Sequence, residues 1–460
     1  MKKELLVALF LSSLLAGRAV YAKDSEDVNI ILNGKKVKLN TSPVIVSGRT
    51  MVPVREIMDA LGGKVVWDKS NKSVTVKDEV NEIVLQIDSL SAVVNKKNDV
   101  LDVVPFIVEG RAMVPLRFLA NSLDINVEWI GELNSVTLTE EEYFDTLPKD
   151  IVMGFTVSYY NNDKLSYTSV QSNKNINMIA VFNYSFDNME NIKIVDEPQQ
   201  ETIEYANNNN IIPLAVVHNI YNGNFNQELL HNMLVDTSKR QVLIHNILIM
   251  LTQNGYGGVN IDFENIKKSD KELFTLFITE LKDVLARHGY ITTVSVPAKT
   301  GDVHTSSWNY AFDYKALGNV ADYIIIMAYD EHYISSQAGS IASINWVKDI
   351  LEYSTKVVPS DKLILGLGLY GYDWSSGKGV AVPAKNCVKL ANENNAKVEW
   401  DIVSKSPHFS YIKNNVYHEV WYEDNDSINE KLDLINKYNL HGVGFWRLGF
   451  EIGGILPTKK

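Results

Sequence analysis

The sequence predicts an α/β protein, a (β/α)8 TIM barrel preceded by a smaller duplicated α+β domain. Two observations indicate this architecture. Over residues 148–457, apolar segments of strand length alternate with amphipathic segments of helix length, which is the pattern of parallel βα repeats. Upstream of that region, one segment recurs at a fixed offset, which indicates an internal repeat. A chain of 460 residues is long enough for two or three domains.

The repeat lies within residues 27–140. Arg49–Arg55 reads Arg-Thr-Met-Val-Pro-Val-Arg, and Arg111–Arg117, 62 positions later, reads Arg-Ala-Met-Val-Pro-Leu-Arg. At the same offset, Trp67 matches Trp129. We expect each copy to contain a strand, a turn with Gly, a short helix that starts at Pro and two further strands. The region should therefore fold as one domain with two similar halves.

Eight strands are expected in the barrel. A capping box at Ser269-Asp270-Lys271-Glu272 is expected to start a helix over Asp270–His288. The long segment 371–441, between the last two strands, holds Trp374, Trp400, Trp421 and Tyr422, and we expect it to form one wall of a cleft. The expected strands are Ile151–Thr156, Met178–Phe182, Ile211–Val217, Gly258–Asp262, Thr292–Val296, Tyr323–Met327, Leu363–Leu367 and Gly442–Trp446.

The clearest candidate for chemistry is the fourth of these strands. Its residues alternate between an apolar set (Val259, Ile261, Phe263) and a polar set (Asn260, Asp262, Glu264), so the polar side chains share one face. In a buried parallel strand, an inward carboxylate pair is costly unless it has a function. Two close carboxyl groups also separate in pKa, so that one is ionised while the other keeps its proton, which suits acid catalysis. The alternative is that the acids cap the next helix, but that helix has a better start of its own.

This segment resembles the strand-four signature of glycoside hydrolase family 18, Asp-Gly-x-Asp-x-Asp-x-Glu. Gly258, Asp262 and Glu264 match the signature, whereas Gly257 and Asn260 stand where the family has Asp. The departures are similar to those of the family's spore-cortex and peptidoglycan-lytic branch. From the residues themselves, we expect the Asn260 amide to donate a hydrogen bond to Asp262 and so help that carboxylate to remain ionised.

Two further segments resemble motifs of the same family. Met327-Ala328-Tyr329-Asp330 is similar to its Met-x-Tyr-Asp motif, and Gly442–Arg447 is similar to its strand-eight signature. The resemblance implies three catalytic residues, with Glu264 as the proton donor, Asp262 orienting the substrate's acetamido group and Tyr329 holding its carbonyl oxygen. The substrate-binding residues that we expect are Asn260, Asp330, Trp446, Tyr370, Tyr184 and Met327. Taken alone, the Tyr-Asp pair and the Trp would also fit a buried Tyr and a core Trp.

Other residues near the expected strand ends carry weaker signals. Phe182, Asn183 and Tyr184 end the second strand and are candidates for substrate contact, whereas His218 and His304, after the third and fifth strands, fit a structural role better. No metal-ligand cluster, Walker loop or dinucleotide fingerprint is present in the sequence, so we expect no cofactor.

The duplicated segment resembles the copper amine oxidase N-terminal-like domain, a stalk module of secreted bacterial proteins. Residues 23–147 contain no His and no Cys, which argues against a copper site. The repeated Arg residues could bind a wall polymer, but the favoured interpretation is structural, with the arginines in salt bridges. Attachment or substrate presentation is the role that we expect for this domain.

Composition restricts the partners and the compartment. The net charge of −12 argues against nucleic acid or anionic lipid as a partner. Residues 1–22 fit a signal peptide, because Lys2 and Lys3 precede the apolar run Leu5–Ala16, which is too short for a membrane span. The single cysteine, Cys387, excludes an internal disulfide.

We therefore expect a secreted or wall-associated, monomeric glycosidase that acts on an N-acetylglucosamine-containing polysaccharide. Peptidoglycan is the first choice of substrate and chitin the second. The rival hypothesis is a non-catalytic carbohydrate-binding protein with the same fold. The acid at Glu264 favours the enzyme.

Overall fold

The computed structural model describes residues 28–158, 164–195, 199–302 and 308–456. The chain divides into two compact units: the residues up to Ile30 with Val37–Val136, and Ile31–Lys36 with the residues from Thr137 onward. The predicted signal peptide lies outside the described residues. Among the described residues, no helix combines the length and apolar character that a membrane span requires.

The second unit contains the predicted barrel. Eight parallel strands follow one another in the order β14–β29–β23–β22–β21–β20–β17–β15, and pairing between β14 and β15 closes the ring. A short antiparallel strand, β16 (Ile192–Ile194), extends β15 at its end. The barrel strands are β14 (Ile151–Thr156), β15 (Met178–Phe186), β17 (Ile212–His218), β20 (Gly258–Asp262), β21 (Ile291–Pro297), β22 (Tyr323–Met327), β23 (Leu363–Gly368) and β29 (Gly442–Trp446).

The strand predictions are confirmed, with small differences at some ends. The largest difference is in β15, which continues to Phe186 and changes register between Phe182 and Tyr184. The barrel strands are buried along nearly their whole length, as expected for a parallel sheet covered on both faces. Alternate side chains fill the barrel interior, among them Phe155, Phe182 and Ile325.

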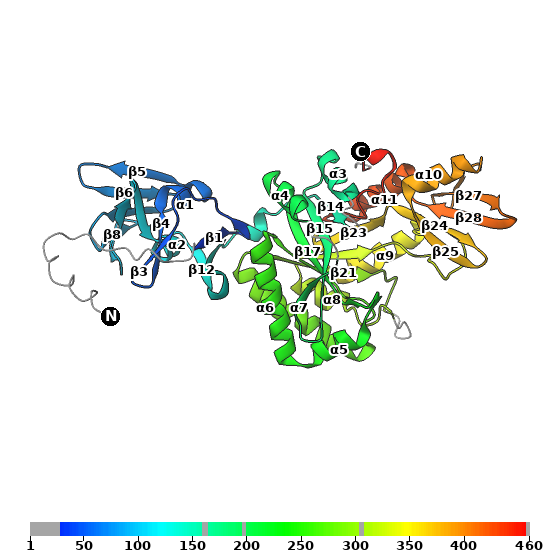
Figure 1. Ribbon diagram of the computed structural model, residues 1–460, viewed down its shortest axis with the longest axis horizontal. Coiled ribbons are helices and arrows are strands. Elements are labelled where there is room, and N and C mark those ends of the chain that lie inside the picture. The colour runs from blue at the N-terminus through cyan, green and yellow to red at the C-terminus, as the bar shows by residue number, and fades with distance from the viewer. Residues whose placement is uncertain (1–27, 159–163, 196–198, 303–307, 457–460) are drawn as a thin grey trace, which may run out of the picture. The chain divides into compact units, whose positions relative to one another are not determined.

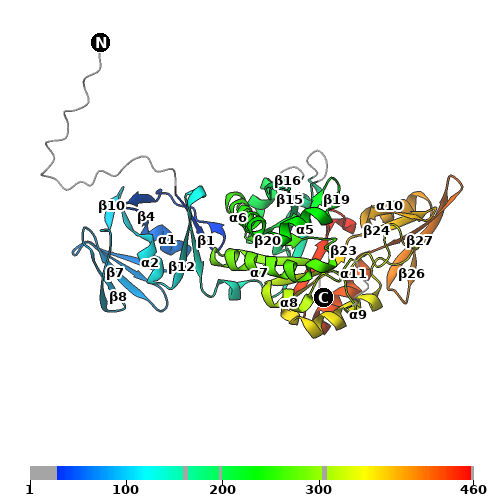
Figure 2. The ribbon, with the colours of Figure 1, turned by 90° about the horizontal axis from the view of Figure 1, so that it is seen from below.

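Helices cover the outside of the barrel (Figures 1 and 2). The capping-box prediction is wrong. Helix α7 begins at Lys271 with Asp270 as its N-cap residue, so Ser269 lies one position too early, and its hydroxyl donates to the Asp270 carboxylate. That carboxylate also accepts from the Nδ1 of His231, at 2.8 Å, and makes no capping bond to the helix backbone. The barrel helices are α3 (Leu165–Ser172), α4 (Gln200–Asn208), α5 (Gln227–Val235), α6 (Thr237–Asn254), α7 (Lys271–Arg287), α8 (Tyr314–Val320), α9 (Ile344–Val357) and α11 (Asn425–Tyr438).

The segment between β23 and β29 forms a small subdomain. Its five antiparallel strands have the order β25–β24–β28–β27–β26, and helix α10 (Ala384–Glu393) packs beside them (Figure 1). Cys387 and Tyr422 lie in the core of this subdomain. The strands are β24 (Tyr370–Ser375), β25 (Lys378–Pro383), β26 (Glu399–Asp401), β27 (Ser406–Lys413) and β28 (Val416–Tyr422).

The N-terminal domain contains the predicted repeat. The central strands β4 (Arg49–Pro53) and β11 (Arg111–Pro115) pair antiparallel, with Val52 opposite Val114, which are equivalent residues of the two copies. The two copies are therefore related by an approximate two-fold axis through this pair. Helices α1 (Val54–Ala60) and α2 (Leu116–Asn121) follow directly, each starting after a proline as expected.

The outer sheets of this domain mix strands from both copies. One sheet has the order β5–β6–β7–β8–β9 and the other the order β12–β13–β1–β2, so each copy contributes its first two strands to the sheet that holds the other copy's last two. Strand β7 has no counterpart in the second sheet. The remaining strands are β1 (Asn29–Leu32), β2 (Lys35–Lys36), β3 (Val44–Val46), β5 (Lys64–Asp68), β6 (Ser73–Lys77), β7 (Glu82–Gln86), β8 (Ser91–Val94), β9 (Lys97–Val100), β10 (Phe106–Val108), β12 (Ile125–Ile130) and β13 (Ser135–Glu140).

Candidate active site

The acid pair lies at the C-terminal end of β20. Asp262 is the last residue of the strand, and Glu264 follows two positions later. Between them, Phe263 is fully buried and packs against Phe277 of α7, with ring centroids 5.7 Å apart. This aromatic anchor fixes the outer face of the segment, so that the alternation continues past the strand and both carboxyl groups share the inner face.

Burial raises the pKa of both carboxyl groups above the ordinary values of Asp and Glu. For Glu264, the negative charges of Asp262 and Asp330 raise the pKa further. Glu264 therefore keeps its proton when Asp262 ionises, which is the division of roles that acid catalysis requires. Asp262 Oδ1 is buried and has no hydrogen-bond partner among the described residues, so this acceptor is free for a ligand.

The predicted hydrogen bond from Asn260 to Asp262 is wrong. The Asn260 amide is fully buried one layer below the acids, where it donates to Thr293 Oγ1, at 2.9 Å, and accepts from Ser295 Oγ, at 3.0 Å. Both partners belong to the neighbouring strand β21, and they satisfy the amide. Asn260 thus supports the floor of the site, and the expectation that it helps Asp262 to ionise has no basis in these contacts.

Tyr329 and Asp330 follow β22 on the same side of the barrel. Burial, with added repulsion from Asp262 and Glu264, raises the pKa of Tyr329 well above that of an ordinary tyrosine, so the phenol remains a neutral donor. Asp330 Oδ1 accepts hydrogen bonds from the hydroxyls of Tyr370 and Tyr372, the latter at 3.0 Å. Tyr370 is therefore next to the site, and its hydroxyl is engaged by Asp330.

The inserted subdomain contributes to these surroundings through β24. Tyr372 packs against Trp374, whose indole nitrogen donates to the backbone carbonyl of Tyr333 in the segment after β22. Of the other aromatic residues of the expected wall, Trp400 of β26 is exposed. Tyr422 is in the core of the subdomain, and the Trp421 indole donates to Glu419.

Trp446 ends β29 and is partly exposed. Its ring meets Phe155 and Phe182 edge-on, with centroids 5.5 and 5.3 Å away, so two core aromatics hold the indole in place. The following peptide bond, to Arg447, is cis. Met327, the last residue of β22, is also partly exposed.

Comparison with known proteins identifies the larger unit. Residues 148–451 match the family described as Glycosyl hydrolases family 18. The chain belongs to this family. Residues 31–138 match the Copper amine oxidase N-terminal domain.

Three proteins to which this family 18 chain is similar are a glycosylase, a spore cortex-lytic enzyme and a chitinase. A putative sporulation-specific glycosylase, YdhD, of Bacillus subtilis is 37% identical over 54% of this chain and 61% of its own length. The crystal structure of the Bacillus cereus spore cortex-lytic enzyme SleL is 27% identical over 68% of this chain and 76% of that chain, with a TM-score of 0.62. A chitinase from Chromobacterium violaceum is 29% identical over 66% of this chain and 96% of that chain, also with a TM-score of 0.62. Residues 148–451 are accordingly a glycosyl hydrolase family 18 unit, and the chain spans about three fifths of the length of YdhD.

Tyr184, like Asn260, is a predicted substrate-binding residue whose side chain the structure buries away from a ligand. The register change in β15 pairs Tyr184 with Val217, whose neighbours in β17 on either side point into the barrel. Tyr184 is only 5% exposed, and its hydroxyl accepts a hydrogen bond from Tyr256 at 3.0 Å. The sequence showed a strand end but not the irregularity that turns this side chain away.

Asn183 of β15 and His218 of β17 carry buried polar atoms; β17 pairs with β20, and β15 is the next strand beyond β17. Both atoms of the Asn183 amide, and Nε2 of His218, have no partner among the described residues. His218 lies opposite Asp262 in the register of β17 and β20, and its ring stacks on Phe182 with centroids 4.5 Å apart. The His218 Nδ1 accepts from the backbone N–H of Ile220, which leaves Nε2 as the protonated nitrogen.

Burial lowers the pKa of His218 to about 3, so the ring is neutral and offers one N–H donor. Buried polar atoms without partners are rare, and they mark places where a ligand or water completes the bonding. The sequence hypothesis that His218 is merely structural therefore misses this donor. His304, the other histidine considered, lies outside the described residues.

Asn219 is a residue that sequence reasoning missed. Its fully buried amide accepts from the backbone N–H of Glu264 and donates to the backbone carbonyl of Glu264, both at 2.9 Å. The same Nδ2 also donates to the carbonyl of Asn226 at 3.3 Å. Asn219 thus acts as a two-point clamp on the backbone of the acid. The available signal was a polar pair, His218-Asn219, directly after an apolar strand.

The site offers no assembled metal centre. Within the described ranges, no group of three or more His, Cys, Asp or Glu side chains is arranged to hold a metal ion.

Proposed function

We propose that this family 18 chain hydrolyses the β-1,4 bond that follows N-acetylglucosamine in peptidoglycan, with retention of configuration and with the substrate's own acetamido group as the nucleophile. The observation that carries the proposal is the pair formed by the buried Asp262 and the half-buried Glu264, in which desolvation and neighbouring negative charge raise the pKa of Glu264. A substrate-assisted route fits this pair, because it needs one protein acid and no protein nucleophile.

In the first step, Glu264 gives its proton to the glycosidic oxygen and the C1–O bond breaks. The carbonyl oxygen of the acetamido group attacks C1, forming an oxazolinium ion. Asp262 Oδ1, which is buried and free, accepts the acetamido N–H and offsets the positive charge that develops on the ring. Tyr329 donates its hydroxyl to the carbonyl oxygen and aligns it for attack.

In the second step, water attacks C1, the bond from C1 to the acetamido oxygen breaks and restores the acetamido group, and the water gives a proton to the Glu264 carboxylate. Each attack on C1 comes from the face opposite the bond that breaks and so inverts the configuration. Two inversions leave the product in the β configuration. Trp446 supports the sugar throughout, because the C–H face of a pyranose packs against an aromatic ring, and this ring is held by Phe155 and Phe182. The neutral His218 supplies an N–H donor beside Asp262 for a hydroxyl group or a bound water.

The choice of peptidoglycan is supported by the similarity to the spore cortex-lytic enzyme and by the branch-like departures at Gly257 and Asn260. Chitin is the second candidate, favoured by the similarity to a chitinase over 96% of that chain. Action outside the cell belongs to the same proposal. Its support is the basic and apolar pattern of residues 1–22.

The test compares the unchanged chain with Glu264→Gln on purified peptidoglycan and on chitin oligomers. We expect new reducing N-acetylglucosamine ends from peptidoglycan with the unchanged chain, and a loss of at least about a hundredfold in the variant, because general acid catalysis contributes about 10²–10⁴. Proton NMR of the first product should show the β anomer. An α product would rule out the acetamido route, and cleavage of chitin alone would replace the substrate.

A further inference from the structure

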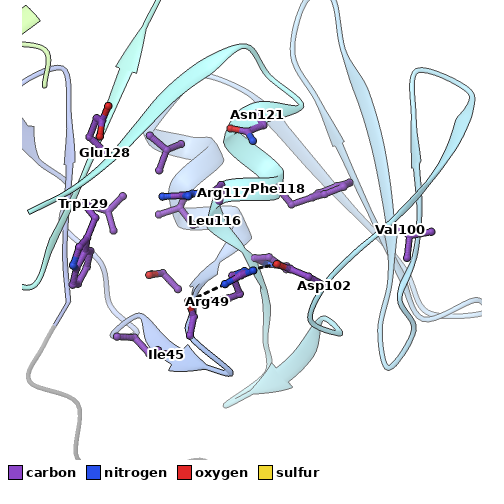
Figure 3. A pocket seen from close by; sticks show the side chains of 15 residues that line it. Ile45, Arg49, Val100, Asp102, Leu116, Arg117, Phe118, Asn121, Glu128 and Trp129 are labelled. Carbon is purple, nitrogen blue, oxygen red and sulfur yellow. Dashed lines mark hydrogen bonds and ion pairs between the residues drawn. The ribbon is translucent and has the colours of Figure 1, made fainter. Parts of the chain in front are cut away.

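Two cavities lie in the N-terminal domain, away from the acid pair. One has a volume of about 730 Å³ and is lined by Arg49, Asp102, Arg117, Glu128 and Trp129 among others. Figure 3 shows this cavity, with Trp129 and Asp102 on opposite sides and both arginines between them. The other cavity measures about 570 Å³. Both volumes fall within the range of ligand pockets, about 300–1,000 Å³.

The two cavities are equivalent under the repeat. Arg111, Arg55 and Trp67 line the second cavity where Arg49, Arg117 and Trp129 line the first, each pair separated by 62 positions. Each cavity takes one arginine from the central strand of one copy, and its tryptophan and second arginine from the other copy. The approximate two-fold axis at β4 and β11 therefore relates the two pockets to each other.

The shared side chains are not explained by packing. Trp67 and Trp129 are 38% and 42% exposed, although a core tryptophan would be covered. Arg55 and Arg117 are exposed and have no ion-pair or hydrogen-bond partner among the described residues. Other lining positions differ between the copies, for instance Thr50 and Ala112.

The second arginine in each pocket is fixed by an ion pair. Arg111 bonds Glu56, with Nε and Oε1 3.0 Å apart, and Arg49 bonds Asp102. The sequence hypothesis that the repeated arginines are structural therefore holds for these two and not for Arg55 and Arg117. Each pocket thus presents an exposed indole face, a held guanidinium and an unpaired guanidinium.

We propose that both pockets bind glycan, each taking a short stretch of the N-acetylated amino-sugar strand that the barrel cleaves. An exposed indole offers a face for the sugar C–H surface, and the planar groups of Arg, Asp and Asn hydrogen-bond hydroxyl and acetamido groups. Two arginines and two acidic residues line each pocket, so neither selects a polyanion. The identity of the glycan rests on the proposed function, whereas the binding itself does not.

The test is co-sedimentation of the full chain with insoluble peptidoglycan, in a Glu264→Gln, Trp446→Ala background that suppresses cleavage and barrel binding. Trp67→Ala and Trp129→Ala are compared singly and together. We expect each single change to weaken binding by about threefold to tenfold, and the double change by at least about a hundredfold, because two linked sites add avidity. Val66→Ala is the matched control, since Val66 is exposed on the same strand as Trp67 and lines neither pocket.

Three further measurements decide between explanations. The double variant Arg55→Gln, Arg117→Gln alters only exposed, unpaired side chains. It should weaken binding to peptidoglycan without changing the thermal unfolding temperature. This variant therefore tests the pockets even if a tryptophan variant fails to fold. Peptide-free glycan strands should bind as well as whole peptidoglycan. Competition by soluble stem peptides alone would overturn the glycan assignment, and binding unchanged in both double variants would overturn the proposal.

With an intact barrel, Trp67→Ala and Trp129→Ala should leave hydrolysis of a short soluble oligosaccharide unchanged, while lowering the rate on the insoluble polymer. A chain that binds through these pockets but cleaves nothing would refute the proposed function alone. A chain that cleaves normally but shows no loss in the pocket variants would refute this inference alone.

Discussion

Asn219→Ala tests whether the clamp on the Glu264 backbone positions the proposed catalytic acid. The substitution removes three hydrogen bonds, two to Glu264 at 2.9 Å and one to Asn226 at 3.3 Å. A neutral hydrogen bond contributes about 1 kcal/mol net, and a backbone N–H left without a partner adds about 1–3 kcal/mol. The free energy of unfolding should therefore fall by roughly 4–6 kcal/mol.

The catalytic effect follows from the same contacts. If about 2 kcal/mol of that loss falls on the transition state, kcat drops about thirtyfold. KM should change less than about twofold, because Asn219 contacts the backbone of the acid and not the substrate. The assay is steady-state hydrolysis of a soluble oligosaccharide, with unfolding measured on the same samples. Asn219→Asp keeps the acceptor for the Glu264 N–H. Its kcat and its free energy of unfolding should therefore lie between those of the unchanged chain and those of Asn219→Ala.

The matched control is Asp236→Ala, which removes the N-cap of α6. It should cost about 1 kcal/mol of stability without touching the segment that carries Glu264. A loss of stability in Asn219→Ala with kcat unchanged would refute the positioning argument, because the clamp would then be only structural. A parallel fall of kcat in the Asp236 variant would refute it too.

Two further predictions address the charges of the larger unit. In the proposed mechanism Glu264 acts as a protonated acid, so the rate should fall as pH rises through its pKa. Asp262→Asn removes a negative charge that raises this pKa, and the basic limb of the residual kcat/KM profile should therefore move to lower pH. An unmoved limb would contradict the coupling. Lys431→Met should lower the free energy of unfolding by about 3–5 kcal/mol, because it leaves the buried Glu423, now 2.7 Å from Lys431 Nζ, without its cation. In urea denaturation, adding Glu423→Leu to Lys431→Met should recover most of the lost free energy of unfolding. If the double variant is no more stable than Lys431→Met, the unpaired charge of Glu423 is not the cause of the loss.

The barrel could be predicted from sequence because its signals are local. Strands buried on both faces read as apolar runs, and the acid pair follows from simple alternation in Val259–Glu264. The predictions failed where a residue distant in sequence hydrogen-bonds a polar side chain that was expected to bond a near neighbour. His231, from α5, bonds the Asp270 carboxylate beside the predicted capping residue Ser269. Thr293 and Ser295 likewise bond the Asn260 amide.

The residues that were missed depend on register between strands. Asn219 and His218 gain their roles only because β17 lies beside β20, with His218 opposite Asp262. A single sequence shows an isolated amide and an isolated imidazole there. Tyr184 was misplaced for the same reason, since the irregularity in β15 is fixed by pairing with β17 and not by its own residues.

The exchange of strands in the N-terminal domain has a consequence for how such a domain can exist. A polypeptide with one copy would supply only part of each outer sheet and part of the wall of each pocket. The domain could then be completed only by a symmetric homodimer. Fusion of two copies turns that association into an intramolecular event, and folding no longer depends on protomer concentration. Strand β7, the piece of chain that joins the copies, occupies a place in one sheet that has no equivalent in the other. The covalent tether has thereby become a structural strand.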